Sequence, residues 1–330
     1  MRAPDFGAPL PTLYGAALEM VAFLDRIGIG SINLMEHHGF PDNYLPTPFV
    51  MGGGVAAVTR RCRISLGAVV LPLHDPVKIA EQIGVLDVMS NGRLEVIIGA
   101  GYVTSEFTRF GVSLKDRGRL LDEGLEIILR ALHGERTGPG GRDIFVRPLP
   151  LQAPEAILRV GGGVEASAKR AARLGLGFAP MTRGLFALYD AECRRHGREP
   201  GVKTGPSGFG DIHLSHDPEA TWAKVLPYLK HSVADYARIA EESGADSPFR
   251  GLLADDQALR ASGMFHVMTP EEVLETAKQI DAYGSMTFMP LIGGMPPELG
   301  WESLELLEQI MPQLRAIEPA PGNEAEGRAA

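Results

Sequence analysis

The sequence contains little cysteine and no excess of positive charge. Two cysteines, Cys62 and Cys193, lie far apart among the 330 residues, which argues against a disulfide framework and against a zinc knuckle. The formal net charge is −9, so no general attraction to nucleic acid or to an anionic lipid surface is expected. These features are typical of a protein that works in a reducing cytoplasm.

Long apolar runs are also missing. The N-terminal residues Met1–Asp5 hold no apolar signal core, and nowhere do about 18 uninterrupted apolar residues form a membrane span. We therefore expect neither export nor a membrane anchor. Hydrophobic residues nonetheless make up 45% of the chain and charged residues 22%, which allows a substantial buried core.

Short apolar runs alternate with longer helical patterns through most of the chain. We predict strands at Ser31–Met35, Ile64–Leu71, Leu94–Ile98, Ile157–Val160, Asp211–Leu214 and Met286–Met289, and helices at Leu18–Ile27, Phe49–Thr59, Pro76–Met89, Arg117–Leu132, Glu165–Leu174 and Ser303–Leu314. This alternation is typical of βαβ units on a parallel sheet. About eight units can be counted, so we predict an α/β fold, a single (β/α)8 TIM barrel over residues 1–318.

Three segments depart from this pattern. Only Met1–Gly7 precede the first helix, so a first strand there is either short or clipped by the start of the sequence. Residues 226–263 are polar, helix-prone and longer than a barrel connection requires, which predicts an inserted, lid-like segment over one mouth of the barrel. Residues 319–330 have too little apolar surface to offset the entropy of ordering, which predicts a disordered tail.

Two adjacent histidines follow the first predicted strand, in the sequence Glu36-His37-His38. In a (β/α)8 barrel the active site is formed where the strands end, so residues at this place are candidates for chemistry. Histidine titrates near neutral pH and can transfer a proton, and two adjacent side chains point to different sides. The alternative interpretation is that one of them is only a packed or solvated loop residue.

Small residues interrupt the next predicted strand at Gly67 and Ala68. A strand this apolar is most often only core, yet small side chains would let a flat ring lie against the backbone. Further along, Asn91-Gly92 indicates a turn, and Asp87 with Arg93 suggests a structural pair at a helix end. Because no third glycine follows Gly99 and Gly101 at the required spacing, no Rossmann site is predicted there.

A glycine turn at Gly161–Gly163 joins a predicted strand to a helix that carries Ser167. Backbone N–H groups at a helix N-terminus bind phosphate, although such a turn can also be a mere connection. His213 and His216 are three residues apart but lack a further ligand at suitable spacing, so no metal site is predicted. No nucleophile elbow or Walker loop supports a hydrolase or an NTPase.

Four motifs together resemble the luciferase-like flavin monooxygenases, in their order and spacing, over about residues 3–177: Glu36–His38, Leu71–Pro76, Leu86–Arg93 and Glu106–Gly111. The resemblance implies a (β/α)8 barrel that binds FMN or, in sister groups, a deazaflavin. It also implies that a separate flavin reductase supplies the reduced FMN, and that the protein is a homodimer. Of the two cofactors, the Glu-His-His triplet favours FMN.

The resemblance also assigns roles to individual residues. His37 matches the catalytic histidine, Glu106 an acidic position near the cofactor, and Gly67-Ala68 the place of a non-proline cis peptide behind the flavin ring. The remaining cofactor-binding residues are Gly99, Gly101, Gly162, Gly163 and Ser167, the last three in a phosphate-binding turn. Luciferase itself carries an arginine where Ala100 stands and a reactive cysteine where Gly99 stands, so phosphate binding would depend on the glycine turn, and light emission is not implied.

The expected function is therefore that of a flavin-dependent monooxygenase that uses reduced FMN and O2 to oxidise a small organic substrate, with His37 and Glu106 as catalytic residues. Two alternatives remain open. A deazaflavin-dependent dehydrogenase would transfer hydride without oxygen, and a non-catalytic flavin-binding barrel would bind the cofactor without turnover.

Overall fold

The computed structural model describes residues 2–206, 210–243, 249, 251–252, 255–281 and 283–318. The predicted tail, 319–330, lies outside these residues. The chain forms two compact units. We call residues 28–38 and 45–206 the five-stranded unit, and residues 2–27, 39–44 and the described residues beyond 206 the three-stranded unit.

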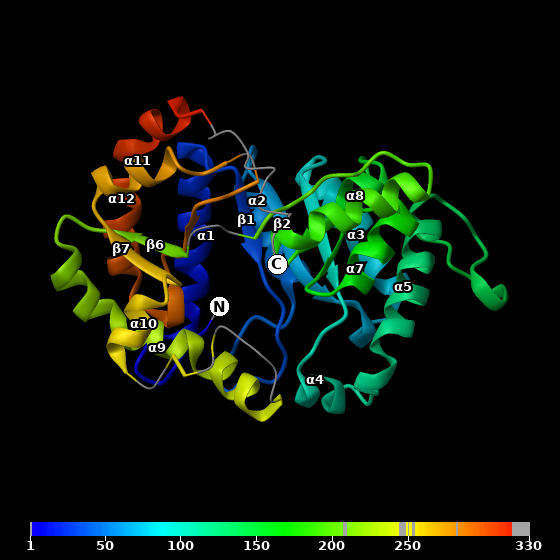
Figure 1. Cartoon of the computed structure of the whole chain (residues 1–330), viewed down its shortest axis with the longest axis horizontal. Coiled ribbons are helices and arrows are strands. Elements are labelled where there is room, and N and C mark those ends of the chain that lie inside the picture. Colours follow the sequence, from blue (N-terminus) through cyan, green and yellow to red (C-terminus); the bar gives the residue numbers. More distant parts are fainter. Residues whose placement is uncertain are drawn as a thin grey trace. The chain divides into compact units, whose positions relative to one another are not determined.

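The five-stranded unit contains one parallel sheet whose strands are neighbours in chain order (Figure 1). The strands are β1 (Ser31–Leu34), β2 (Arg63–Val70), β3 (Leu94–Gly99), β4 (Leu158–Gly162) and β5 (Gly177–Pro180). The main helices are α2 (Pro48–Val58), α3 (Pro76–Ser90), α5 (Arg117–Leu132), α7 (Glu165–Leu174) and α8 (Phe186–Arg195), with the shorter α4 (Thr104–Arg109) and α6 (Pro154–Ile157). The apolar residues Ile64, Leu66, Leu94, Val96 and Ile98 of β2 and β3 are fully buried, as expected of a parallel sheet that is covered by helices.

Helix α3 shows how local chemistry sets these boundaries. Asp75 caps its first turn by accepting hydrogen bonds from the backbone N–H groups of Val77 (2.9 Å) and Lys78 (3.2 Å). Asn91 ends the helix in the left-handed conformation, with φ of 56°. The helix face predicted to pack on the sheet is buried, and α3 packs against β3 and against the neighbouring helices α2 and α5.

The three-stranded unit contains a parallel sheet in the order β7-β6-β8. These strands are β6 (Asp211–Leu214), β7 (Phe265–Met268) and β8 (Thr287–Phe288), accompanied by helices α1 (Leu10–Ile27), α9 (Pro218–Ser243), α10 (Asp256–Ala261), α11 (Pro270–Ala277) and α12 (Pro297–Ala316). The predicted lid-like segment 226–263 begins within α9, where Leu229 and Val233 pack in the same buried cluster as Phe265 of β7. Its role as a lid stays a prediction.

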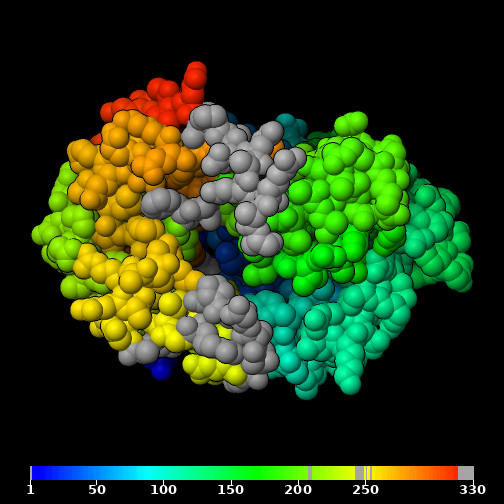
Figure 2. Space-filling view, viewed as in Figure 1, coloured from blue at the N-terminus to red at the C-terminus, as the bar shows by residue number. Residues whose placement is uncertain are grey.

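The described residues contain eight strands, all in parallel pairs, which agrees with the count of about eight units. Residues 2–9 form no strand, and the first strand of the described residues is β1. In the space-filling view, residues coloured teal to green form most of the surface that the five-stranded unit shows (Figure 2). Within the described residues, we find no helix with both the length and the apolarity to span a bilayer.

Two titratable side chains of β6 lie largely away from solvent in the three-stranded unit: His213 is buried and Asp211 is half-buried. Burial raises the pKa of Asp211 to about 7 and lowers the pKa of His213 to about 4. Within the part of the chain that the structure describes, His213 Nδ1 has no hydrogen-bond partner. Both side chains are therefore favoured in their neutral forms when the protein is folded.

This burial predicts that replacing Asp211 by Asn changes the pH dependence of stability. The unfolded carboxyl ionises near pH 4, whereas the folded one keeps its proton up to about pH 7, so wild-type stability falls as the pH rises through this window. Asp211→Asn should remove this loss. Its effect on the free energy of unfolding should therefore be ~1–2 kcal/mol more favourable at pH 8 than at pH 4.5. Urea denaturation at both pH values measures the difference.

The control variant is Asp256→Asn, which changes a largely exposed carboxyl in the same unit. Its effect on the free energy of unfolding should be nearly the same at the two pH values. An effect of Asp211→Asn that is also independent of pH would contradict the inference.

Candidate active site

Three segments of the five-stranded unit bring titratable side chains together. Glu36, His37 and His38 follow β1, His74 follows the short helical turn after β2, and Glu106 lies in α4 after β3. Because the carboxyl ends of neighbouring parallel strands lie at one edge of the sheet, these side chains meet there. Glu36, His37, His38 and Glu106 are all buried.

Glu106 binds the segment after β1 at two points. One of its oxygens, Oε1, lies 2.9 Å from His37 Nδ1 and also accepts a hydrogen bond of 2.9 Å from the backbone N–H of His38. Because the same oxygen accepts the His38 N–H, we assign it as the acceptor in both contacts and place the hydrogen of this pair on Nδ1 of His37. In neutral His37, Nε2 is then the basic nitrogen, which is the tautomer that a proton-accepting histidine requires.

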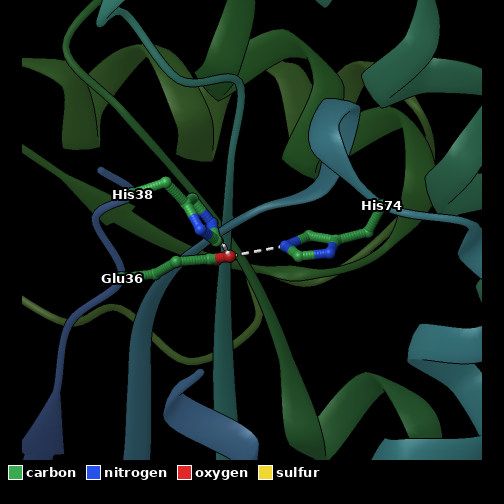
Figure 3. Close-up of side chains that lie close together, drawn as sticks. All are labelled: Glu36, His38 and His74. Carbon is green, nitrogen blue, oxygen red and sulfur yellow. Dashed lines mark hydrogen bonds and ion pairs between the residues drawn. The ribbon is translucent and has the colours of Figure 1, made fainter. Parts of the chain in front are cut away.

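Glu36 forms a second centre, in which two imidazoles meet one carboxylate oxygen (Figure 3). Glu36 Oε1 lies 2.7 Å from His38 Nε2 and 2.5 Å from His74 Nε2, while Oε2 accepts a hydrogen bond of 2.8 Å from the backbone N–H of Val70. Burial alone would raise the pKa of Glu36, but the hydrogen bonds from His38, His74 and Val70 and the charge of His74 lower it to about 2. Glu36 is therefore ionised throughout the neutral range.

The two adjacent histidines point to different carboxylates, as their neighbouring positions predicted. His37 binds Glu106, and its ring lies edge-on to Tyr102 at 6.4 Å between centroids. The ring of His38 packs edge-on against Phe110 at 4.7 Å. The interpretation of one histidine as a packed residue therefore suits His38, whereas His37 is held by a carboxylate that fixes its tautomer.

Gly67 and Ala68 lie at an irregular point of β2. The peptide bond between them is cis, as the resemblance implied, and the pairing of β2 with β3 shifts register there. A Cβ on Gly99 would lie 3.1 Å from the Cβ of Ala68, so the neighbouring strand has no side chain at this point. Gly67, Ala68 and Gly99 thus form a patch of small residues, which we call the floor.

The backbone conformation and the packing at position 101 both require glycine. Its φ is 74°, in the left-handed region, and a Cβ there would lie 2.6 Å from Val70 Cγ1 and 2.8 Å from Phe107 Cε2. Gly101 is thus required by the turn itself. A role in cofactor binding stays a prediction for this residue.

The predicted phosphate turn follows β4 and leads into α7. Gly162 has a φ of 149°, and a Cβ there would lie 2.9 Å from Oγ of Ser167. Ser167 is buried, and its hydroxyl donates to the carbonyl of Val164 at 2.5 Å. No side chain among the described residues caps the first turn of α7, so its backbone N–H groups are better placed to bind an anion than the Ser167 hydroxyl.

The proposed pairing of Asp87 with Arg93 is wrong. Asp87 is fully buried and accepts hydrogen bonds from the backbone N–H groups of Leu151 (2.7 Å) and Gln152 (3.0 Å). Arg93 instead donates to the carbonyl of Cys62 at 2.7 Å. Both residues are structural, because each satisfies backbone groups of a different loop.

Sequence reasoning missed His74 as a site residue. It belongs to one of the motifs that carry the resemblance, but no role was assigned to it. The signal was present in its position directly after the turn that ends β2, where a parallel sheet places functional side chains.

Comparisons with known proteins identify the family. The sequence pattern of the luciferase-like monooxygenases matches residues 6–282, and the chain belongs to this family. A curated relative, the oxygenase component of the flavin-dependent trigonelline monooxygenase of Acinetobacter baylyi, is 31% identical over 148 residues, which are 43% of this chain and 41% of the relative. The matched regions span about a third to two fifths of the length of the curated relatives.

Solved structures share the fold. The oxygenating constituent of the 3,6-diketocamphane monooxygenase of Pseudomonas putida, in complex with FMN, matches with a TM-score of 0.73 and 17% identity over 97% of both chains. An F420-dependent secondary alcohol dehydrogenase matches with a TM-score of 0.67 and 15% identity over 92% of this chain and 95% of the other. The prediction of an α/β fold of the (β/α)8 class is confirmed.

The geometry predicts unequal effects of two substitutions at Glu106. Glu106→Ala leaves His37 Nδ1–H and the His38 N–H buried without their acceptor, which should cost ~2–4 kcal/mol of stability. Glu106→Gln keeps an acceptor oxygen and should cost less than half of that. Urea denaturation measures both free energies of unfolding.

Long-range proton–nitrogen NMR spectra of the histidine rings provide a second measurement. Wild type and Glu106→Gln should both show His37 mainly as the Nδ1–H tautomer, and Glu106→Ala should not. Equal tautomer populations in all three proteins would show that Glu106 does not orient the ring.

Proposed function

We propose that this protein is a flavin-dependent monooxygenase that uses reduced FMN and O2 to oxidise a small organic substrate. The observation that carries the proposal is the carboxylate-held imidazole of His37 at the same strand ends as the floor formed by Gly67, Ala68 and Gly99. Membership of the luciferase-like monooxygenases supports oxygenation as the class of reaction.

The residues of the five-stranded unit suit a flavin in two respects. Gly67, Ala68 and Gly99 carry no side chain larger than a methyl group, and Ile97 Cδ1 lies 3.0 Å from the position of a Cβ on Gly67, so a planar ring would approach the backbone beside Ile97. The first turn of α7, behind the Gly161–Gly163 turn, offers backbone N–H groups and the positive end of a helix dipole to a phosphate. Gly67, Ala68 and Gly99 would therefore lie beneath the ring, and Gly162 and Gly163 would lie beside the phosphate.

When bound, reduced FMN would supply the electrons and the oxygen-activating chemistry of the reaction. The residues of this chain would carry out proton transfer. Glu106 keeps the hydrogen of His37 on Nδ1, so that Nε2 can accept a proton from a reacting group or return it. Glu36 keeps the His38 ring away from this role by binding its Nε2.

A deazaflavin-dependent dehydrogenase is the second candidate function. It is supported by the fold shared with the F420-dependent secondary alcohol dehydrogenase. A non-catalytic flavin-binding barrel is the third, and it is supported by Ala100, which provides no cation for a flavin phosphate. The separate reductase, the homodimer and the cytoplasmic location remain predictions, and the oxygenase component among the relatives supports a protein that works with a partner.

Cofactor titration separates the three functions. We expect purified protein to bind FMN more tightly than the deazaflavin. With a flavin reductase and NADH present, it should consume O2 as it oxidises one substrate from a panel of aldehydes, sulfonates, alkanes and terpenes. Tight deazaflavin binding with hydride transfer and no O2 consumption would establish the dehydrogenase. Binding of FMN without any turnover would leave the non-catalytic barrel.

His37→Ala should lower turnover by about 100-fold or more while the Kd for FMN changes by about twofold or less. The reason is that the imidazole serves proton transfer and the floor and the glycine turn hold the cofactor. The matched control is His133→Ala, which removes an exposed histidine that binds Glu155 in the same unit, and it should retain full turnover. Equal rates for the two variants would remove His37 from the mechanism.

Gly162→Ala should weaken the binding of FMN but not of riboflavin, which lacks the phosphate. The added Cβ would lie 2.9 Å from the Ser167 side chain and would displace the turn that leads to the α7 amides. We expect the Kd for FMN to rise by about tenfold, which corresponds to about 1.4 kcal/mol. Flavin fluorescence titration measures both ligands.

Gly118→Ala is the control for this experiment, because no heavy atom of the described residues lies within 4 Å of a Cβ built at position 118. It should leave both dissociation constants unchanged. An equal loss of FMN and riboflavin binding in Gly162→Ala would place the phosphate elsewhere.

A further inference from the structure

We propose that Glu36, His38 and His74 form a binding site for a divalent first-row transition cation, with Zn²⁺ as the representative ion. The site lies in the five-stranded unit and is separate from the pair of His37 and Glu106. Nothing in the proposal depends on which flavin the protein binds, or on whether it binds one.

The donor atoms define the class of ion. Two imidazole nitrogens and one carboxylate oxygen are the ligands that Zn²⁺ and its neighbours in the first transition row accept. Calcium and magnesium prefer sets of oxygen ligands, so this cluster is poorly suited to them. Three protein ligands would leave a fourth position for water or another small ligand.

The three donor groups are already gathered at one point (Figure 3). One ligand atom from each residue lies within 4.8 Å of the other two. Ligands at about 2.0–2.1 Å from a tetrahedral zinc ion lie roughly 3.4 Å from one another. Since both Nε2 atoms lie at 2.5–2.7 Å from Glu36 Oε1, the ion could replace the shared hydrogens after the three groups separate slightly.

The surroundings hold the three ligands in the required orientation. The N–H of Val70 binds Glu36 Oε2 and leaves Oε1 directed at the two imidazoles. Phe110 packs against the ring of His38 and restricts its rotation. Such outer contacts orient metal ligands and raise affinity.

The three ligands differ in exposure, so the site is shielded from water on one side and accessible on the other. The side chain of Glu36 is 1% exposed and that of His38 9%, whereas that of His74 is 25% exposed. An ion would therefore enter past His74 and would be shielded from bulk water on the side of Glu36. A ligand that is partly exposed can also be replaced with little effect on the core.

The cluster differs from the other contacts between histidine and carboxylate in the described part of the chain. His37 with Glu106, His133 with Glu155 and His231 with Asp42 each join one imidazole to its carboxylate. At Glu36, two imidazoles meet the same oxygen. One imidazole is enough for a hydrogen bond that only supports the fold. The second imidazole at Glu36 Oε1 brings the number of potential metal ligands to three.

Metal titration of protein without a polyhistidine tag, dialysed first against a chelator, tests the proposal. Calorimetry with Zn²⁺ should give one site per chain with a Kd in the micromolar range or lower. Titration with Co²⁺ should produce the strong visible absorption of a site with four or five ligands. The absence of stoichiometric Zn²⁺ uptake by the wild-type protein would overturn the proposal.

Variants locate the ion. His74→Ala and His74→Gln should each weaken Zn²⁺ binding by about tenfold or more and abolish the Co²⁺ absorption, and circular dichroism during heating checks that both variants fold. His133→Ala provides the matched control, since it removes a histidine that binds a carboxylate on the surface of the same unit. If the His74 variants and the control bind Zn²⁺ equally well, the site does not lie at Glu36.

Discussion

The hydrogen bonds that Glu106 accepts are the constraint on which the candidate site depends. A single carboxylate oxygen binds both the ring of His37 and the backbone N–H of His38, so the helix after β3 fixes the loop after β1. This arrangement decides which ring nitrogen carries the hydrogen as well as where the ring lies. Without this carboxylate, His37 would lose the hydrogen bond that fixes its tautomer.

Hydrogen bonds also stabilise the second buried carboxylate of the site, that of Glu36. A buried carboxylate is costly unless hydrogen bonds offset the loss of water, and here two imidazoles and one backbone N–H do so. The result is a carboxylate that is ionised in the neutral range beside His38 and His74. The two adjacent histidines thus contact different carboxylates through different ring nitrogens, His37 through Nδ1 and His38 through Nε2.

Much of the five-stranded unit could be predicted from the sequence, because most of its strands are continuous apolar runs and the helices between them carry apolar residues at helical spacing. Strand β5 was missed since it consists of Gly177, Phe178, Ala179 and Pro180, whose glycine and proline are poor strand signals. The meeting of His74 with Glu36 could not be predicted from spacing, since it depends on two strand ends that become neighbours only in the sheet. The predicted pairing of Asp87 with Arg93 was wrong for a similar reason, because each side chain binds backbone groups of a different loop.

The choice between FMN and a deazaflavin cannot be made at the floor. The two cofactors share a flat tricyclic ring of nearly the same outline, so a surface of small residues accepts either one. A phosphate held by backbone N–H groups would not distinguish them either, since both cofactors carry phosphate groups. A proton-accepting group near the ring suits both reactions, because oxygenation moves protons around the flavin and dehydrogenation of an alcohol releases a proton together with the hydride. His37, with its tautomer fixed by a buried carboxylate, could serve either one. Membership of the luciferase-like monooxygenases, rather than the floor or His37, is therefore what favours oxygenation as the class of reaction.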